Sequence, residues 1–248
     1  MMNIENALLN YFNGDAPFNG FGIEVVRSSY KWQVPKTSFN NEQMDFGGTN
    51  FEANVQLKLF LNRCWHEDAG TQKKIVKWII SDWGGIRGNK ESTLEKYHAL
   101  SLQKHPETPL NGIASFSKVL AIVDPFKYAI YDARVAVSLN AVQMICSACS
   151  GEAFPYLPGR NNITGNWDPK KPRGFSKNSA ASIKTLLSPP YNWNKIPSNS
   201  AYARYLKILN SISGNINVPL YELEMTLFSQ AEALALKAIP SLRIKDDP

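Results

Sequence analysis

The stretch that decides the fold is PLNGIASFSKVLAIVDPFKYAIYDARVAV, residues 109–137. A turn around Asn111-Gly112 precedes an apolar helix, Asp124-Pro125 ends that helix in a loop, and Asp132 follows Ile130-Tyr131 at the start of another helix. Such a turn can hold a phosphate group while the carboxylate faces whatever lies against that phosphate. One supersecondary unit can therefore provide both binding and catalysis.

The turn offers free backbone donors at the start of a helix. Gly112 permits a conformation that is closed to other residues, and Ala114 and Ser115 belong to the first helical turn after it. Helix N-termini attract phosphate without reading base sequence, because the amides and the helix dipole respond only to negative charge. The same residues also fit a plain helix–turn–helix corner that binds nothing.

Asp132 has two interpretations that are compatible with each other. As the N-cap of the following helix it stabilises that helix by about 1 kcal/mol and needs no function. A capping carboxylate with buried neighbours is also fixed and ionised, as the stabilisation of a developing positive charge requires. Arg134, two residues later, can reach a backbone phosphate or pair with a carboxylate, and both possibilities stay open.

Composition and charge narrow the class of protein. The 248 residues include 27 Lys and Arg against 21 Asp and Glu, a net charge of +6 that favours a polyanionic partner without proving one. No apolar run approaches the roughly 18 residues that cross a bilayer, so we expect no membrane insertion. The N-terminal MMNIENALLNYF is typical of an amphipathic helix rather than a signal peptide, so we expect a cytoplasmic protein.

The cysteines predict neither a disulfide framework nor a metal site. Cys64, Cys146 and Cys149 make an odd count, which favours a reducing compartment. Cys146 and Cys149 form a CxxC on a predicted helix, but no further thiols or imidazoles occur at matching spacing. We therefore expect two small apolar side chains on a buried helical face, with no bound metal and no cofactor.

Helical periodicity dominates the chain and predicts a mainly α fold. Strand signals occur early, at residues 22–26 and 30–34, so we expect a small β or irregular element near the N-terminus. Residues 37–50 and 151–178 are predicted long loops. The predicted helices are 4–12, 51–65, 71–83, 92–103, 115–123, 133–148, 180–187, 201–212 and 220–238, and we assign the apolar stripe of the last, with its Glu224 and Phe228, to the core.

Two further segments are candidates for contacts with a nucleic acid. The loop 151–178 interleaves Arg160 and other basic residues with aromatic residues such as Phe154, a pairing expected at single-stranded or distorted nucleic acid, although a solvated loop pinned by its aromatics fits equally. The stretch SDWGGIRGN, residues 81–89, places three glycines around Arg87. Trp83 can stack on an extruded base and Arg87 can meet a phosphate, or the glycines simply end a helix whose Trp83 is in the core.

Residues 109–135 resemble the hairpin and the following aspartate of the helix–hairpin–helix DNA glycosylases, in particular their 8-oxoguanine-glycosylase-like branch. Gly112 matches the first glycine of the family's Leu-Pro-Gly-Val-Gly hairpin, Ala114 stands at the second, and Asp132 matches the aspartate. The resemblance implies a single catalytic unit over residues 1–248, built of two helical lobes. It also implies an enzyme, expected to be a monomer, that bends duplex DNA, extrudes one nucleotide and cuts its N-glycosidic bond.

The chain departs from the family where bifunctional members carry a Schiff-base lysine. That position, two residues after the second hairpin glycine, is Phe116, and the nearest lysine is Lys118. An ungapped alignment implies a monofunctional enzyme in which water attacks and Asp132 does the central work, whereas a shifted hairpin makes Lys118 the nucleophile. The four cysteines of the iron–sulfur loop found in some relatives are missing.

We therefore expect a DNA glycosylase that acts on a modified or damaged base. Candidate catalytic residues are Asp132 and Lys118, candidate DNA contacts are Gly112, Ala114, Ser115, Arg134 and Arg160, and a candidate base pocket contains Trp83, Arg87 and Phe154. A hypermodified, even glucosylated, cytosine of phage DNA is one target, and an oxidised purine is the other. A non-catalytic DNA-binding module is the alternative class, and a nuclease is less favoured because carboxylates are not clustered at metal-binding spacing.

Overall fold

The computed structural model describes residues 3–36, 38–39, 42–146, 151–155, 157, 159, 161, 164, 180–189 and 191–238. The described chain is mainly helical, as the periodicity predicts. Its helices are α1 (Ile4–Asn13), α2 (Ile23–Ser29), α3 (Asn50–Glu67), α4 (Ala69–Trp78), the π-helical turn η1 (Ile79–Trp83), α5 (Glu91–Ser101), α6 (Ile113–Val123), α7 (Ala133–Ile145), α9 (Ala180–Leu187), α10 (Ala201–Ile216) and α11 (Leu220–Ala238).

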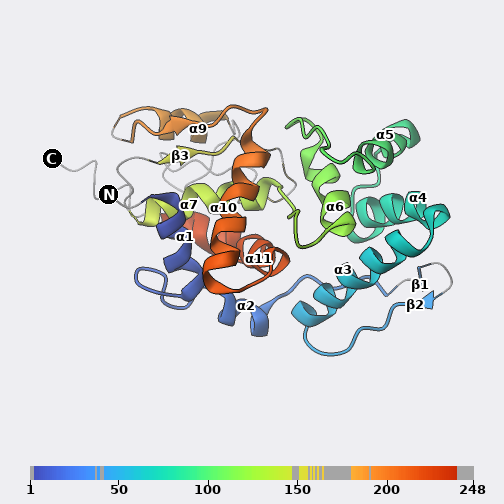
Figure 1. Ribbon diagram of the computed structural model, residues 1–248. Coiled ribbons are helices and arrows are strands. Elements are labelled where there is room, and N and C mark those ends of the chain that lie inside the picture. The colour runs from blue at the N-terminus through green and yellow to red at the C-terminus, as the bar shows by residue number, and fades with distance from the viewer. Residues whose placement is uncertain are drawn as a thin grey trace.

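The helices form two groups that share one hydrophobic core (Figure 1). Helices α3 to α6 form one group, and α1, α2, α7, α10 and α11 form the other, so the first and the last described helices belong to the same group. Helix α7 lies at the centre of the second group, packed along α11, and all of its side chains except that of Arg134 are buried. The link from α6 to α7 therefore passes from one group to the other.

The predicted strand at residues 22–26 is wrong, because these residues begin helix α2. Val25-Val26 favours a strand by propensity, but Val26 packs in a small core cluster with Met225 of α11, and tertiary packing overrides the propensity. Arg27 joins Glu222 of α11 at 2.7 Å. Residues 30–34, also a predicted strand, are irregular.

The strands of the described chain are four two-residue pieces. The strand β1 (Ser38–Phe39) pairs antiparallel with β2 (Glu42–Gln43) inside the segment predicted as a loop, and β3 (Glu152–Ala153) pairs in parallel with β4 (Asn194–Lys195). A small β element therefore does lie near the N-terminus, one segment later than the two predicted strands. The predicted loop 151–178 lies largely outside the described residues.

The predicted helix 71–83 divides into α4 and the π-helical turn η1. In η1 the backbone N–H of Gly84 donates to the carbonyl oxygen of Ile79 at 3.0 Å, one residue further back than in an α-helix. The wider turn changes the direction in which Trp83 and the following glycines leave the helix. Those residues reach the cavity described next.

Candidate functional site

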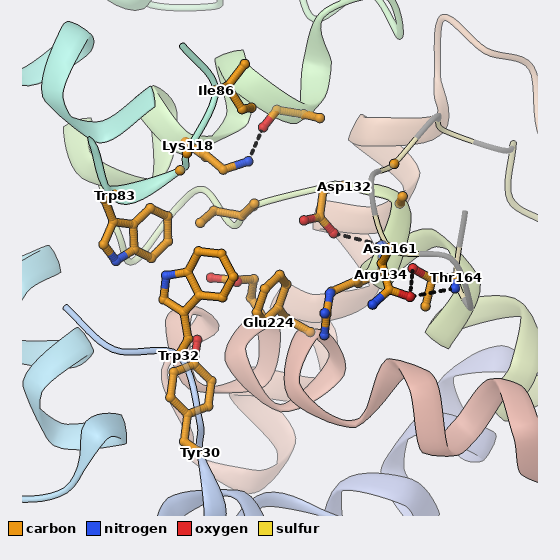
Figure 2. Close-up of a pocket in the computed structure, with 17 residues that line it drawn as sticks. Tyr30, Trp32, Trp83, Ile86, Lys118, Asp132, Arg134, Asn161, Thr164 and Glu224 are labelled. Carbon is orange, nitrogen blue, oxygen red and sulfur yellow. Dashed lines mark hydrogen bonds between the residues drawn. The ribbon is translucent and has the colours of Figure 1, made fainter. Parts of the chain in front are cut away.

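A cavity of about 710 Å³ lies between the two groups of helices (Figure 2). Its volume falls within the roughly 300–1,000 Å³ that is typical of small-molecule sites. The walls come from the segment after α2, from η1 and the glycines after it, from the first turns of α6 and α7, from α11, and from residues 159, 161 and 164. Segments that are far apart in sequence therefore meet at one cavity.

Asp132 is the N-cap of α7, as the sequence predicts, and it also lines the cavity. Its Oδ1 accepts hydrogen bonds from the backbone N–H groups of Arg134 at 3.0 Å and Val135 at 3.1 Å. Figure 2 shows the carboxylate between Lys118 and Arg134, at the edge of the cavity. Because the cap uses Oδ1, the second oxygen is the one that can meet a ligand.

Buried hydroxyl groups fix the segment that leads into Asp132. The hydroxyl of Tyr202 donates to the carbonyl oxygen of Ala129 at 2.9 Å, and that of Tyr205 donates to Ile130 at 3.0 Å. The hydroxyl oxygen of Ser117 on α6 accepts from the backbone N–H of Tyr131 at 3.0 Å. The chain before the carboxylate is thus held from both helix groups, which preorganises the position of the charge.

Lys118 faces the cavity from α6, whereas Phe116 does not. Phe116 is buried in the core and stacks on Tyr97, with ring centroids 5.4 Å apart. Lys118 is 8% exposed, and its Nζ donates to the carbonyl oxygen of Ala114 at 2.5 Å. Burial lowers the pKa of the Lys118 amine, and the negative charges of Asp132 and Glu224 oppose that shift. The lysine amine that lines the described part of the cavity is therefore partly desolvated.

The hairpin turn itself is closed by its own backbone. Gly112 has φ +82°, in the left-handed region that favours glycine, and its carbonyl oxygen accepts from the N–H groups of Ser115 and Phe116, both at 3.0 Å. The N–H of Ile113 donates to Leu110. Several donors of the first turn are therefore already used, and the Ser115 side chain, a predicted DNA contact, is 8% exposed.

Aromatic rings form one side of the cavity. The ring of Trp32 lies edge-to-face against Trp83 at 6.3 Å and against Phe228 at 5.5 Å, and Tyr30 lines the same side. Trp83 is 7% exposed and its Nε1 donates to Asn54 Oδ1 at 3.0 Å, while Trp32 is 37% exposed. Trp83 therefore lies in the core, as one of its two interpretations predicts, and it also lines the cavity. Its stacking on an extruded base stays a prediction.

A second carboxylate, Glu224 of α11, lines the cavity opposite Asp132 (Figure 2). Its Oε2 accepts from Nζ of Lys58 on α3 at 2.5 Å, and the two side chains are 3% and 2% exposed. Burial raises the pKa of the Glu224 carboxyl, and the Lys58 ammonium opposes the rise. Such an ion pair supplies the partner that a charged group needs when it is removed from water.

The other predicted site residues divide between the cavity and places away from it. Arg134 lines the cavity, pairs with Glu232 at 2.9 Å and lies over the Phe228 ring at 4.9 Å, so its guanidinium has a carboxylate partner. Arg87 is exposed and does not line the cavity. Phe154 is fully buried against Tyr131. Arg160 lies outside the described residues.

The sequence pattern does not identify four of the cavity-lining residues, namely Tyr30, Trp32, Glu224 and Phe228. It predicts a strand for the first two and a core stripe for the last two. One feature of the sequence does single out Glu224. Glu224 and Phe228 are four residues apart on one face of a helix, and the carboxylate interrupts an otherwise apolar stripe. A carboxylate in that position needs a partner or a ligand.

The described residues hold no cluster of three or more His, Cys, Asp or Glu side chains arranged for a metal ion. Burial raises the pKa of the Cys146 thiol to about 11, so this thiol is protonated at neutral pH, and Cys149 lies outside the described residues. None of the described helices combines the length and the apolar character that crossing a bilayer requires.

The arrangement can stabilise a cationic centre and hold a flat ring. Asp132 supplies a fixed negative charge, Lys118 a partly desolvated amine, and the aromatic side a surface for stacking or edge contacts. Comparisons of the chain with protein-family models, with curated proteins and with solved structures found no match.

Proposed function

We propose that the protein is a DNA glycosylase that takes an extruded base into this cavity and cuts its N-glycosidic bond. The observation that carries the proposal is the position of Asp132: a carboxylate fixed at the start of α7, at the edge of a cavity of about 710 Å³ with an aromatic side. The resemblance of residues 109–135 to the glycosylase hairpin and the net charge of +6 also support it.

The chemistry follows from the bond that breaks. As the bond between C1′ and the base nitrogen lengthens, the sugar gains oxocarbenium character, and a nearby carboxylate stabilises that charge. Asp132 is assigned this role. In the hydrolytic route a water oxygen bonds to C1′, the water gives up a proton, and the base leaves with the electron pair of the broken bond and a proton. Extruding the base costs a few kcal/mol, which aromatic contacts in the cavity offset.

Lys118 offers a second route to the same cleavage. Its amine can attack C1′ in place of water, and the base leaves with the electron pair of the broken bond and one amine proton. The C1′–O4′ bond then opens as the second amine proton moves to O4′, which gives an imine, and loss of a C2′ proton with departure of the 3′ phosphate cleaves the strand. The orientation of Lys118 toward the cavity and of Phe116 toward the core favours this amine over any group at position 116. The hydrolytic and amine routes differ in one intermediate, which can be trapped.

The volume of the cavity indicates the size of base that it can hold. A bare base is smaller than the ligands that fill cavities of about 300–1,000 Å³, so there is space for a substituted base. A hypermodified cytosine, glucosylated or hydroxymethylated, is our leading substrate, and 8-oxoguanine is the second. Duplex DNA that carries such a base is the proposed partner.

The first experiment measures abasic sites. Purified protein is incubated with phage DNA containing hypermodified cytosine, with 8-oxoguanine duplexes and with unmodified DNA, and alkali then converts abasic sites to breaks. We expect breaks on a modified substrate and a loss of at least about 100-fold in Asp132→Asn, the scale of removing a group that stabilises transition-state charge. Mass spectrometry identifies the released base. If no substrate yields abasic sites, the proposal is wrong.

Asp124→Asn is the matched control. Asp124 Oδ1 accepts from the N–H groups of Phe126 and Lys127, the same local pattern as in Asp132, but it does not line the cavity. Its substitution is expected to leave activity unchanged. A similar loss in both variants would assign the effect of Asp132→Asn to folding rather than to chemistry.

Borohydride reduction distinguishes the two routes. An imine between Lys118 and the sugar is reduced to a stable protein–DNA cross-link, which is lost in Lys118→Gln. A cross-link in the wild type assigns the amine route, and abasic sites without a cross-link assign attack by water.

A further inference from the structure

Glu224 has no role in the cleavage steps of the proposed reaction. Its carboxylate lines the same cavity as Asp132, on the side formed by α11 and the aromatic residues, and it is paired with a buried lysine. Lys58 does not line the cavity, so its ammonium contacts Glu224 from within the protein. The pair therefore presents a carboxylate, and not an ammonium, to whatever enters.

An ionised carboxylate discriminates between ligand edges because it only accepts hydrogen bonds. It accepts from an exocyclic amino group, as Asp and Glu do from N4 of cytosine. A carbonyl oxygen in the same place would face a negative charge and would add no donor to the one that Lys58 gives the carboxylate in this desolvated site. The flanking Trp32 and Phe228 supply the apolar contacts that hold a flat ring in register with it.

Among the described residues that line the cavity, the cationic side chains Lys118 and Arg134 already contact acceptors. Nζ of Lys118 donates to the carbonyl oxygen of Ala114, and the guanidinium of Arg134 pairs with Glu232. Glu224 is paired with the ammonium of Lys58, which does not line the cavity. Its position therefore makes the Glu224 carboxylate an acceptor for a base edge on the aromatic side.

We propose that Glu224 is the specificity residue of this cavity and selects a base that carries an exocyclic amino group, the cytosine type, over its carbonyl counterpart, the uracil type. The proposal rests on the proposed function in one respect, that the cavity holds an extruded base. It adds which edge of that base is recognised, the edge that carries the exocyclic amino group. It is independent of whether the bond is then cut.

The test compares two bases that differ at one group. Duplexes carry one 5-hydroxymethylcytosine or one 5-hydroxymethyluracil, each opposite an abasic-site analogue so that neither base is paired. Equilibrium binding is measured with the Asp132→Asn protein, in which turnover is suppressed. We expect at least about tenfold tighter binding of the cytosine duplex, because tenfold corresponds to about 1.4 kcal/mol and one unmet buried acceptor costs about that much or more.

Glu224→Gln in the same background tests the residue itself. The amide can turn to present either its N–H or its oxygen, so the preference is expected to fall to about threefold or less, since a group that both donates and accepts satisfies either edge. Glu222→Gln is the control: Glu222 lies on the same helix and pairs with Arg27, but it does not line the cavity. We expect Glu222→Gln to keep the same preference for the cytosine duplex as the Asp132→Asn protein. If Glu224→Gln unfolds, the double variant Lys58→Met/Glu224→Gln, which lacks both charges, is used in its place.

The results separate the two proposals. Equal binding of the two duplexes, or an unchanged preference in folded Glu224→Gln, overturns the role of Glu224 even if abasic sites form. A preference that depends on Glu224 without abasic sites on any DNA supports the specificity role and removes the glycosylase proposal. Failure to bind either duplex overturns the role of Glu224, and the glycosylase proposal is then decided by the abasic-site assay alone.

Discussion

Asp132 both caps α7 and borders the cavity. Oδ1 caps α7 through two backbone N–H groups, and the side chain borders the cavity. Asn caps a helix about as well as Asp, so we expect Asp132→Asn to change the free energy of unfolding by less than about 0.5 kcal/mol, and Asp132→Ala to lower it by about 0.5–2 kcal/mol. Urea unfolding measures both. A large loss of stability in Asp132→Asn would mean that the negative charge itself holds the fold.

The segment before Asp132 permits a comparison of two tyrosines. The hydroxyl of Tyr205 donates to Ile130, whereas the buried hydroxyl of Tyr131 meets no hydrogen-bond partner among the described residues. Tyr205→Phe is therefore expected to destabilise the protein by about 1 kcal/mol, and Tyr131→Phe to leave its stability unchanged or to raise it by up to about 1 kcal/mol. Thermal unfolding of the pair checks this, and equal losses would contradict it.

Single residues differ in how far the sequence reveals them. Asp132 was predicted as a cap because its partners are two and three residues away. Glu224 falls in a stripe that the pattern assigns to the core, because its partner, Lys58, is 166 residues away and only the folded chain brings the two together. Phe154 looked like a base contact because it neighbours basic residues in sequence, yet it is fully buried.

At the scale of elements, the hairpin before α6 depends on the conformation of one glycine. Gly112 has φ +82°, and a Cβ there would lie 2.5 Å from Oη of Tyr97. Gly112→Ala is therefore expected to lower the free energy of unfolding by more than about 1 kcal/mol, because alanine is strained at positive φ. Gly88→Ala is the control, since a Cβ at Gly88 meets nothing within 4 Å. Equal stability of the two variants in urea would contradict the prediction.

Elements were predictable where local pattern and packing agree. Helices α6 and α11 lie where the apolar spacing predicts them, although α6 is buried on nearly all sides. The prediction fails at α2, where β-branched residues pack on α11, and at η1, where a π-helical hydrogen bond widens a turn that the sequence reads as ordinary helix. The second failure matters for the site, because η1 carries Trp83 to the cavity.

At the scale of the whole molecule, the cavity separates two helix groups that a buried ion pair connects. Lys58 belongs to α3 in one group and Glu224 to α11 in the other (Figure 1). The sequence predicts that both helices exist, but not that they meet, because nothing local couples residues so far apart. The ion pair thus links α3 to Glu224, the residue proposed to select the base.

Removing one partner leaves a buried charge unpaired, which typically costs about 3–5 kcal/mol, whereas replacing both with apolar residues is often close to neutral. We therefore expect Lys58→Met to lower the free energy of unfolding by about 3–5 kcal/mol and Lys58→Met/Glu224→Leu to recover most of that loss. Arg27→Met is the control: Arg27 also pairs with α11, through Glu222, but 41% of its side chain is exposed, so a loss of about 1 kcal/mol or less is expected. Urea unfolding of the four proteins completes the comparison. If the double variant is no more stable than Lys58→Met, the cost lies in packing around Lys58, and the charge of Glu224 does not depend on its partner.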